Sequence, residues 1–91
     1  MKRVLRTRSY QADLDAIEAY IARDHPNAGL DMWLHIDDQV QHLADPKFPR
    51  RSGRVAGTTE LVAHENYLVV FVEDASTVTV LNVVHARKNY P

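Results

Sequence analysis

Residues 59–85 read TELVAHENYLVVFVEDASTVTVLNVVH, and this stretch decides the fold. It holds three runs rich in β-branched and aromatic residues, at 59–64, 67–73 and 77–85, which predict three β-strands. The turns EN and EDAS that separate the runs are short, so consecutive strands must be antiparallel neighbours. The nearly continuous apolar run at 68–72 predicts a central strand covered on both faces or nearly so.

Upstream of the strands, residues 10–24 carry apolar side chains at spacings of four, three and four, which predict an amphipathic helix. The members of this apolar stripe are Tyr10, Leu14, Ile17 and Ile21. Ser9 is the expected N-cap, and Pro26 should prevent the helix from continuing past Asp24.

A second helix is expected over residues 28–44, with Asn27 as its cap. Its buried stripe consists of Trp33, Ile36, Val40 and Leu43. The short turn DHPN predicts that the two helices form an antiparallel hairpin. With a short strand over RVLRT, the expected order is β-α-α-β-β-β. This order predicts an α+β domain, a helical hairpin on a mostly antiparallel sheet, that spans residues 1–91 as a single domain.

The composition narrows the functional classes. The chain has no cysteine, which excludes a disulfide framework and thiolate metal sites. No apolar run reaches membrane-spanning length and no signal peptide is visible, so we expect a cytoplasmic protein that does not interact with membranes. No Gly-rich phosphate loop or His-based metal motif is present, and no cofactor or metal is predicted.

Charge is segregated along the chain although the net charge is only −1. Residues 11–45 hold eight acids against one base, Arg23, whereas residues 46–57 hold four bases and no acid. The basic loop, DPKFPRRSGR at residues 45–54, supplies the candidate target-binding or nucleic-acid-binding cations Lys47, Arg50, Arg51 and Arg54. Phe48 within it can stack on a base or anchor the loop in the core. The loop is therefore either a binding surface for an anionic partner or a solvated surface.

A second candidate site follows the last predicted strand. His85, Arg87, Lys88 and Tyr90 lie within six residues of one another. Strand alternation puts Leu81, Val83 and His85 on one face. A base, a cation and an acid are what RNA cleavage by a neighbouring 2′-hydroxyl requires, and none of this requires a metal. The alternative is a strand-end histidine followed by a frayed polar segment.

Three quoted stretches together resemble the RelE/ParE superfamily, the toxins of type II toxin–antitoxin modules. ELVAHENYLVVFVEDASTVTVLNVVHAR resembles its C-terminal strands, DLDAIEAYIARDHPNAG its first helix and turn, and VQHLADPKFPRRSGR its second helix and basic loop. The resemblance implies the β-α-α-β-β-β fold and a toxin of a plasmid stabilisation module. It also implies a cognate antitoxin that neutralises the toxin in a hetero-oligomer.

The resemblance implies one of two targets. ParE-like members poison DNA gyrase, whereas RelE-like members are metal-independent endoribonucleases that cut mRNA on the ribosome. Ribonuclease members tend to carry an arginine where this chain has Leu68, which favours the ParE-like branch. Arg87 matches a second catalytic arginine, and His85 or Tyr90 could complete a ribonuclease site, with Lys88 and the basic loop contacting the target. An inactive relative that only binds its antitoxin is a third possibility.

Overall fold

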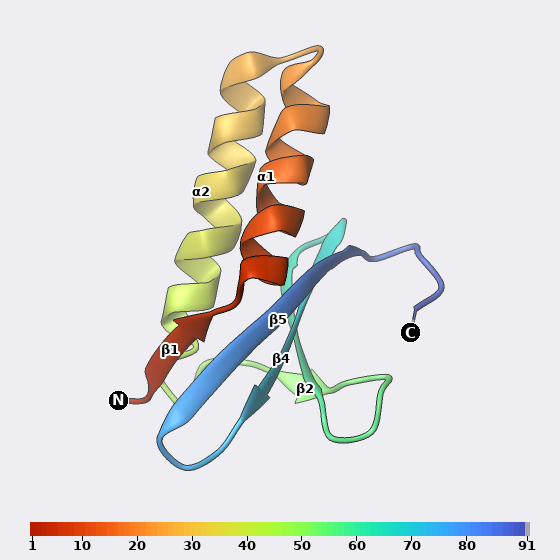
Figure 1. Cartoon of the computed structure of the whole chain (residues 1–91). Coiled ribbons are helices and arrows are strands. Elements are labelled where there is room, and N and C mark those ends of the chain that lie inside the picture. The colour runs from red at the N-terminus through yellow and green to blue at the C-terminus, as the bar shows by residue number, and fades with distance from the viewer. Residues whose placement is uncertain (91) are drawn as a thin grey trace.

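Two helices pack on one face of a five-stranded sheet in the computed structural model, which describes residues 1–90 (Figure 1). The elements are β1 (Arg3–Arg6), α1 (Arg8–Ala22), α2 (Pro26–His42), β2 (Arg51–Ser52), β3 (Thr59–His64), β4 (Tyr67–Glu73) and β5 (Thr77–His85). The predicted α+β architecture is confirmed. No helix among the described residues is long and apolar enough to cross a membrane.

The sheet has the order β1-β5-β4-β3-β2. Strands β2 to β5 form antiparallel pairs, whereas β1 joins the far side of β5 in parallel. The short β2 was not predicted, because its two residues lie within the basic loop. It exists because Arg51 and Ser52 pair with Glu60 and Thr59 and so extend the sheet beyond β3.

Both predicted helix caps are wrong by two residues. Thr7, rather than Ser9, caps α1, and its hydroxyl accepts a 3.2 Å bond from the Tyr10 amide and donates a 2.7 Å bond to the Val80 carbonyl. This second bond to β5 favours the earlier cap. Helix α2 begins at Pro26 without a side-chain cap, and Asn27 already lies inside it. Proline suits this first position because it has no N–H to leave unsatisfied.

The core lies between the helical hairpin and the sheet, and its buried members include Tyr10, Leu14, Ile36, Val40, Val69, Phe71, Val78 and Val80. Most of the two predicted helical stripes is therefore confirmed, although Ile17, Ile21 and Trp33 are only partly buried. The phenol of Tyr10 donates a 2.8 Å bond to Asp37. Burial and this carboxylate raise the pKa of Tyr10 far above its ordinary value, so the phenol stays neutral.

Strand β4 is central, as predicted, and Leu68, Val69, Val70 and Phe71 are each no more than 6% exposed. On β5, however, the predicted alternation is right for Val83 and His85, which share a face, but wrong for Leu81. Phe71 pairs with Val80 while Val70 pairs with Asn82, so Leu81 is an extra, bulged residue. The bulge changes the phase of the strand and lets both Val80 and Val83 face the helices.

The turn between β4 and β5 depends on Asp74, whose Oδ1 accepts bonds of 2.8 Å from the amides of Ser76 and Thr77. These amides lower the pKa of Asp74 below its ordinary value of 3.8. A carboxyl with a lowered folded-state pKa stabilises the fold above its unfolded-state pKa. That stabilisation is lost as the pH falls through the folded-state pKa.

We therefore expect Asp74→Ala to lower the melting temperature at neutral pH, with a difference from the wild type that shrinks below pH 3.8. Thermal unfolding followed by circular dichroism at several pH values measures this. Asp74→Asn is the control, because its amide oxygen can still accept both backbone bonds, which go to one oxygen of Asp74, but without a charge. An Asp74→Ala deficit that is constant from neutral to strongly acidic pH would contradict the assigned cause.

Candidate functional site

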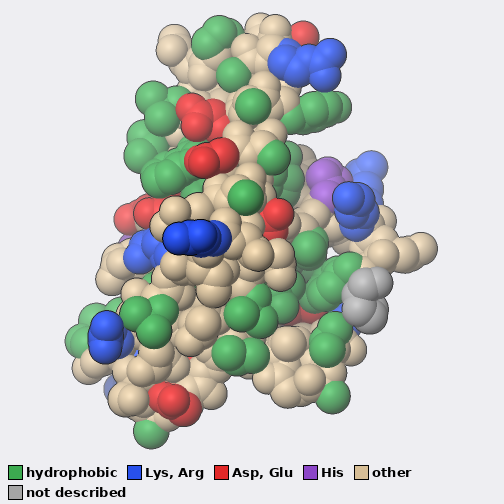
Figure 2. Space-filling model, viewed as in Figure 1, with side chains coloured by type: hydrophobic (Ala, Val, Ile, Leu, Met, Phe, Trp, Pro, Cys, Tyr) green, Lys and Arg blue, Asp and Glu red, His purple; other side chains and the backbone are tan. Residues whose placement is uncertain are grey.

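The structure brings together the two basic segments that the sequence singled out. The Arg54 side chain donates a 3.1 Å bond from Nη1 to the Lys88 carbonyl, and its guanidinium carbon lies 4.8 Å from the centre of the Tyr90 ring. The basic loop thus contacts the C-terminal segment, residues 86–90, although more than 30 residues separate them. Figure 2 shows Lys and Arg side chains beside a histidine on the side where the chain ends.

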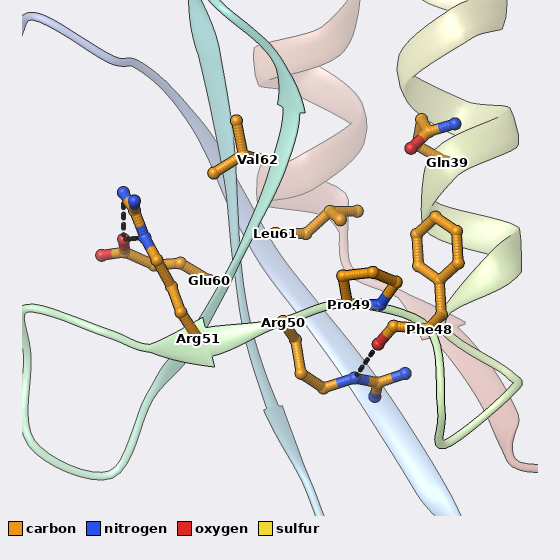
Figure 3. Close-up of a pocket in the computed structure, with 8 residues that line it drawn as sticks. All are labelled: Gln39, Phe48, Pro49, Arg50, Arg51, Glu60, Leu61 and Val62. Atoms are coloured by element: carbon orange, nitrogen blue, oxygen red, sulfur yellow. Dashed lines mark hydrogen bonds and ion pairs between the residues drawn. The ribbon is translucent and has the colours of Figure 1, made fainter.

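Glu60 on β3 accepts hydrogen bonds from two residues of the basic loop and so holds the loop against the sheet. Its side chain is only 1% exposed, and Oε1 accepts 3.2 Å bonds from Arg51, whereas Oε2 accepts a 3.1 Å bond from the Arg54 amide. Figure 3 shows Arg51 reaching across to this carboxylate. Arg51 keeps 55% of its side chain exposed, so it can still meet a partner.

Arg50 points the other way and is part of the fold. Its guanidinium donates to Glu73 (2.6 Å) and to the carbonyls of Leu43 (3.2 Å) and Asp45 (2.5 Å), and Nε donates to Phe48 (3.0 Å). Only 12% of the side chain is exposed. Arg50 thereby satisfies carbonyls at the C-terminal end of α2. The sequence marked Arg50 as a target-binding residue, but little of it is available to a partner.

Phe48 and Lys47 complete the basic loop, one packed against the core and the other exposed. Phe48 packs against the core, which bears out the anchoring role, and its ring lies 5.1 Å from that of His42. Together with Gln39, Pro49 and Leu61 it lines a pocket of about 320 Å³ between α2 and β3 (Figure 3). Lys47, which directly precedes Phe48, is exposed.

His85 and Arg87 line a groove of about 780 Å³ between α1 and the end of β5, called here the α1–β5 groove. The Arg87 amide donates a 3.2 Å bond to Nδ1 of His85. Because Nδ1 accepts this bond, the neutral ring carries its proton on Nε2. At Nε2 the neutral His85 ring can therefore donate a hydrogen bond but not accept one. Lys88 also lines the groove, whereas Tyr90 contacts Arg54 instead.

Tyr67 and Asp13 line the α1–β5 groove but were not identified as site residues from the sequence. The centre of the Tyr67 ring lies 5.4 Å from that of the His85 ring. Burial, and to a smaller extent the nearby Tyr20, raises the pKa of Tyr67. Asp13 on α1 accepts 3.0 Å bonds from the Val83 amide and from the Asn82 side chain. The sequence does not reveal this role of Asp13, because the β5 bulge beside the bonds leaves no local sequence pattern.

Leu68 faces away from the helices, since its neighbour Val69 lies in the core between helices and sheet. It is 3% exposed and pairs with Val62 on β3 and Val84 on β5. The position at which ribonuclease relatives are expected to carry an arginine is therefore a buried apolar position in this chain. Among the described residues, no three His, Cys, Asp or Glu side chains are placed to hold a metal ion.

Comparison with known proteins gives three kinds of similarity. A family model described as the ParE toxin of the type II toxin–antitoxin system parDE matches residues 4–90. A curated Sinorhizobium fredii protein named "Putative toxin Y4kP" is 33% identical over 78 residues, which cover 86% of this chain and 81% of that protein.

Among solved structures, a chain of the chromosomal ParDE toxin–antitoxin system from P. aeruginosa superposes with a TM-score of 0.82 at 24% identity, over 93% of this chain and 96% of that one. A copper-bound mutant toxin from Helicobacter pylori superposes with a TM-score of 0.63 at 13% identity, over 99% of this chain and 100% of that one. At these identities the two structures support the fold alone.

Proposed function

Because the chain belongs to the ParE toxin family of type II toxin–antitoxin systems, we propose that it inhibits growth by binding DNA gyrase. The observation that carries this choice is the buried Leu68, which is 3% exposed and apolar where a ribonuclease relative would place a cation. Without that cation, the charge that develops on a cleaved phosphate loses one source of stabilisation. A binding function needs no such group.

The proposed target-facing surface consists of the exposed cations of the two basic segments: Lys47, Arg51, Arg54, Arg87 and Lys88. Arg50 is left out because its guanidinium is occupied by internal acceptors. Exposed cations on one surface favour association with an acidic protein surface or with the DNA that gyrase holds.

We expect the double variant Arg87→Ala, Lys88→Ala to keep its fold but to inhibit gyrase supercoiling roughly fivefold to tenfold less, because two exposed ionic contacts are each worth up to about 1 kcal/mol. Supercoiling assays over a range of toxin concentrations measure the loss. Arg23→Ala, in the turn between the helices, is the matched control and should inhibit like the wild type. Wild-type protein without effect on gyrase even at high excess would eliminate this target.

An antitoxin is the expected second partner, and we propose that part of it contacts the helical hairpin. Tyr20, Leu30 and Leu34 are 70%, 48% and 53% exposed there. The eight acids of residues 11–45 lie in the same two helices and their connections. A partner helix with an apolar face flanked by Lys or Arg would complement both features. Loss of antitoxin binding in Leu34→Glu, with binding retained in Lys47→Ala, would support this placement, and unchanged binding in Leu34→Glu would rule it out.

Ribosome-dependent mRNA cleavage is the second candidate function, favoured by one observation. His85 and Arg87 line the same groove, so an imidazole that can donate a hydrogen bond lies in one groove with a cation. Primer extension on mRNA after induction distinguishes the candidates, since new 5′ ends would indicate cleavage. Normal growth after induction without antitoxin would instead identify a relative that retains only antitoxin binding.

A further inference from the structure

Glu60 is a buried carboxylate at the base of the target-facing surface. At 1% exposure, its charge has lost nearly all contact with water, which costs free energy unless protein donors replace the water. The donors come from two places in the chain: the Arg51 side chain bonds one carboxylate oxygen and the Arg54 amide bonds the other. Glu60 therefore determines how Arg54 leaves β2.

The backbone around Arg54 is further restrained by hydrogen bonds within residues 53–58. The Gly53 amide donates a 2.9 Å bond to the Thr58 carbonyl, and the Thr58 amide donates a 3.1 Å bond to Val55. A Cβ added at Gly53 would lie 2.1 Å from Oγ1 of Thr58, so the two sides of the turn touch. The Arg54 side chain consequently projects from a fixed backbone.

The C-terminal segment depends on Arg54. Ala86 is still tied to the sheet, because its amide donates a 2.8 Å bond to Asn66. The Arg87 and Lys88 amides bond only locally, to His85. Beyond Ala86, Arg54 supplies the hydrogen bond to the Lys88 carbonyl and the cation over the Tyr90 ring, while the Tyr90 hydroxyl is buried without a hydrogen-bond partner among the described residues.

From this chain of contacts we propose that Glu60 is a positioning residue for target binding. It orients Arg54, Arg54 holds the C-terminal segment, and the cations of the two segments thereby form one ordered surface. Ordering these cations before binding reduces the entropy that binding would otherwise cost. The inference rests on the proposed function for its consequence in target binding, but the ordering itself can be measured without a target.

The first experiment measures order in the C-terminal segment. Trypsin cuts after Arg87 and Lys88, and mass spectrometry of the intact chain follows the loss of the residues beyond them. Glu60→Gln keeps the shape of the side chain, but its amide has one acceptor oxygen where the carboxylate has two. We expect cleavage at these sites to be roughly fivefold faster in Glu60→Gln, because local opening becomes easier. Glu65→Gln, an equal charge change in the exposed β3–β4 turn, should cleave like the wild type.

Arg54→Lys provides an independent variant that keeps the positive charge. Lysine lacks the planar guanidinium that stacks on Tyr90 while bonding Lys88, so the segment should again be cleaved faster. If positioning matters, Arg54→Lys and Glu60→Gln should both inhibit gyrase less than the wild type, with circular dichroism spectra unchanged. Should Glu60→Gln not fold, Arg54→Lys still decides whether Arg54 orders the C-terminal segment, the step through which Glu60 would act.

The outcomes separate the two proposals. Unchanged tryptic cleavage in the folded variants would overturn the ordering role of Glu60, whatever the target is. Faster cleavage with full gyrase inhibition would overturn its role in target binding. If the wild type itself leaves gyrase unaffected, the proposed function fails, while faster cleavage in the variants still supports the ordering role.

Discussion

Arg50→Ala is expected to destabilise the folded chain by about 2–4 kcal/mol. The substitution removes the donor to the Leu43 and Asp45 carbonyls just after α2, the donor to the Phe48 carbonyl in the basic loop, and one of the two cations that pair with Glu73. Lys2, 2.7 Å from the same carboxylate oxygen, still neutralises Glu73, which keeps the loss below that of an unpaired buried charge. A chain of 91 residues is stable by about 5–14 kcal/mol, so the loss is a large fraction of the total.

Chemical denaturation followed by circular dichroism gives the free energy of unfolding of this variant. Lys47→Ala is the matched control, a cation of the same loop with an exposed side chain, and should change stability by less than about 0.5 kcal/mol. Equal stability of the two variants would show that Arg50 does not support α2. Arg50 would then again be a candidate target-facing cation.

Leu68→Arg is expected to cost about 3–5 kcal/mol, because it would place a cation at a position that is 3% exposed. The neighbours across the sheet, Val62 and Val84, are apolar and offer the guanidinium no acceptor through their side chains. Introducing the arginine of the ribonuclease relatives should therefore lower stability without creating mRNA cleavage. The same denaturation experiment, with primer extension on induced cells, measures both effects.

Leu68→Met is the control for Leu68→Arg. Its side chain has similar volume and no charge, so the cost should stay below about 1.5 kcal/mol. A stable Leu68→Arg protein that cleaves mRNA would show that this surface needs only one cation to become catalytic. It would reverse the preference for gyrase.

The fold was largely predictable because strand and helix patterns are local. The apolar run at 68–72 and the stripes of the helices depend on periodicity, which sequence reports directly. The caps were not predictable in the same way, because Thr7 was selected by its bond to Val80 on a strand more than 70 residues away. The bulge at Leu81 was missed for a related reason, since it is defined by pairing with β4 rather than by a local signal.

The candidate site was predictable as a set of residues but not as a surface. Sequence identified Arg50 and Arg54 as equivalent cations of one loop, yet one supports α2 and the other holds the C-terminal segment. Which way each points depends on the carboxylates of Glu73 and Glu60, which come from different strands. These carboxylate partners can be identified only when the pairing of the strands is known.

The parallel pairing of β1 with β5 affects how the chain folds as the ribosome synthesises it. β1 is made first, but its partner is the last of the seven elements to emerge, and α1 also packs on that strand. Until β5 is synthesised, β1 has no partner strand and the apolar faces of the two helices cannot be fully buried. The β1–β5 pairing, and with it the complete sheet, therefore cannot form until β5 has been synthesised.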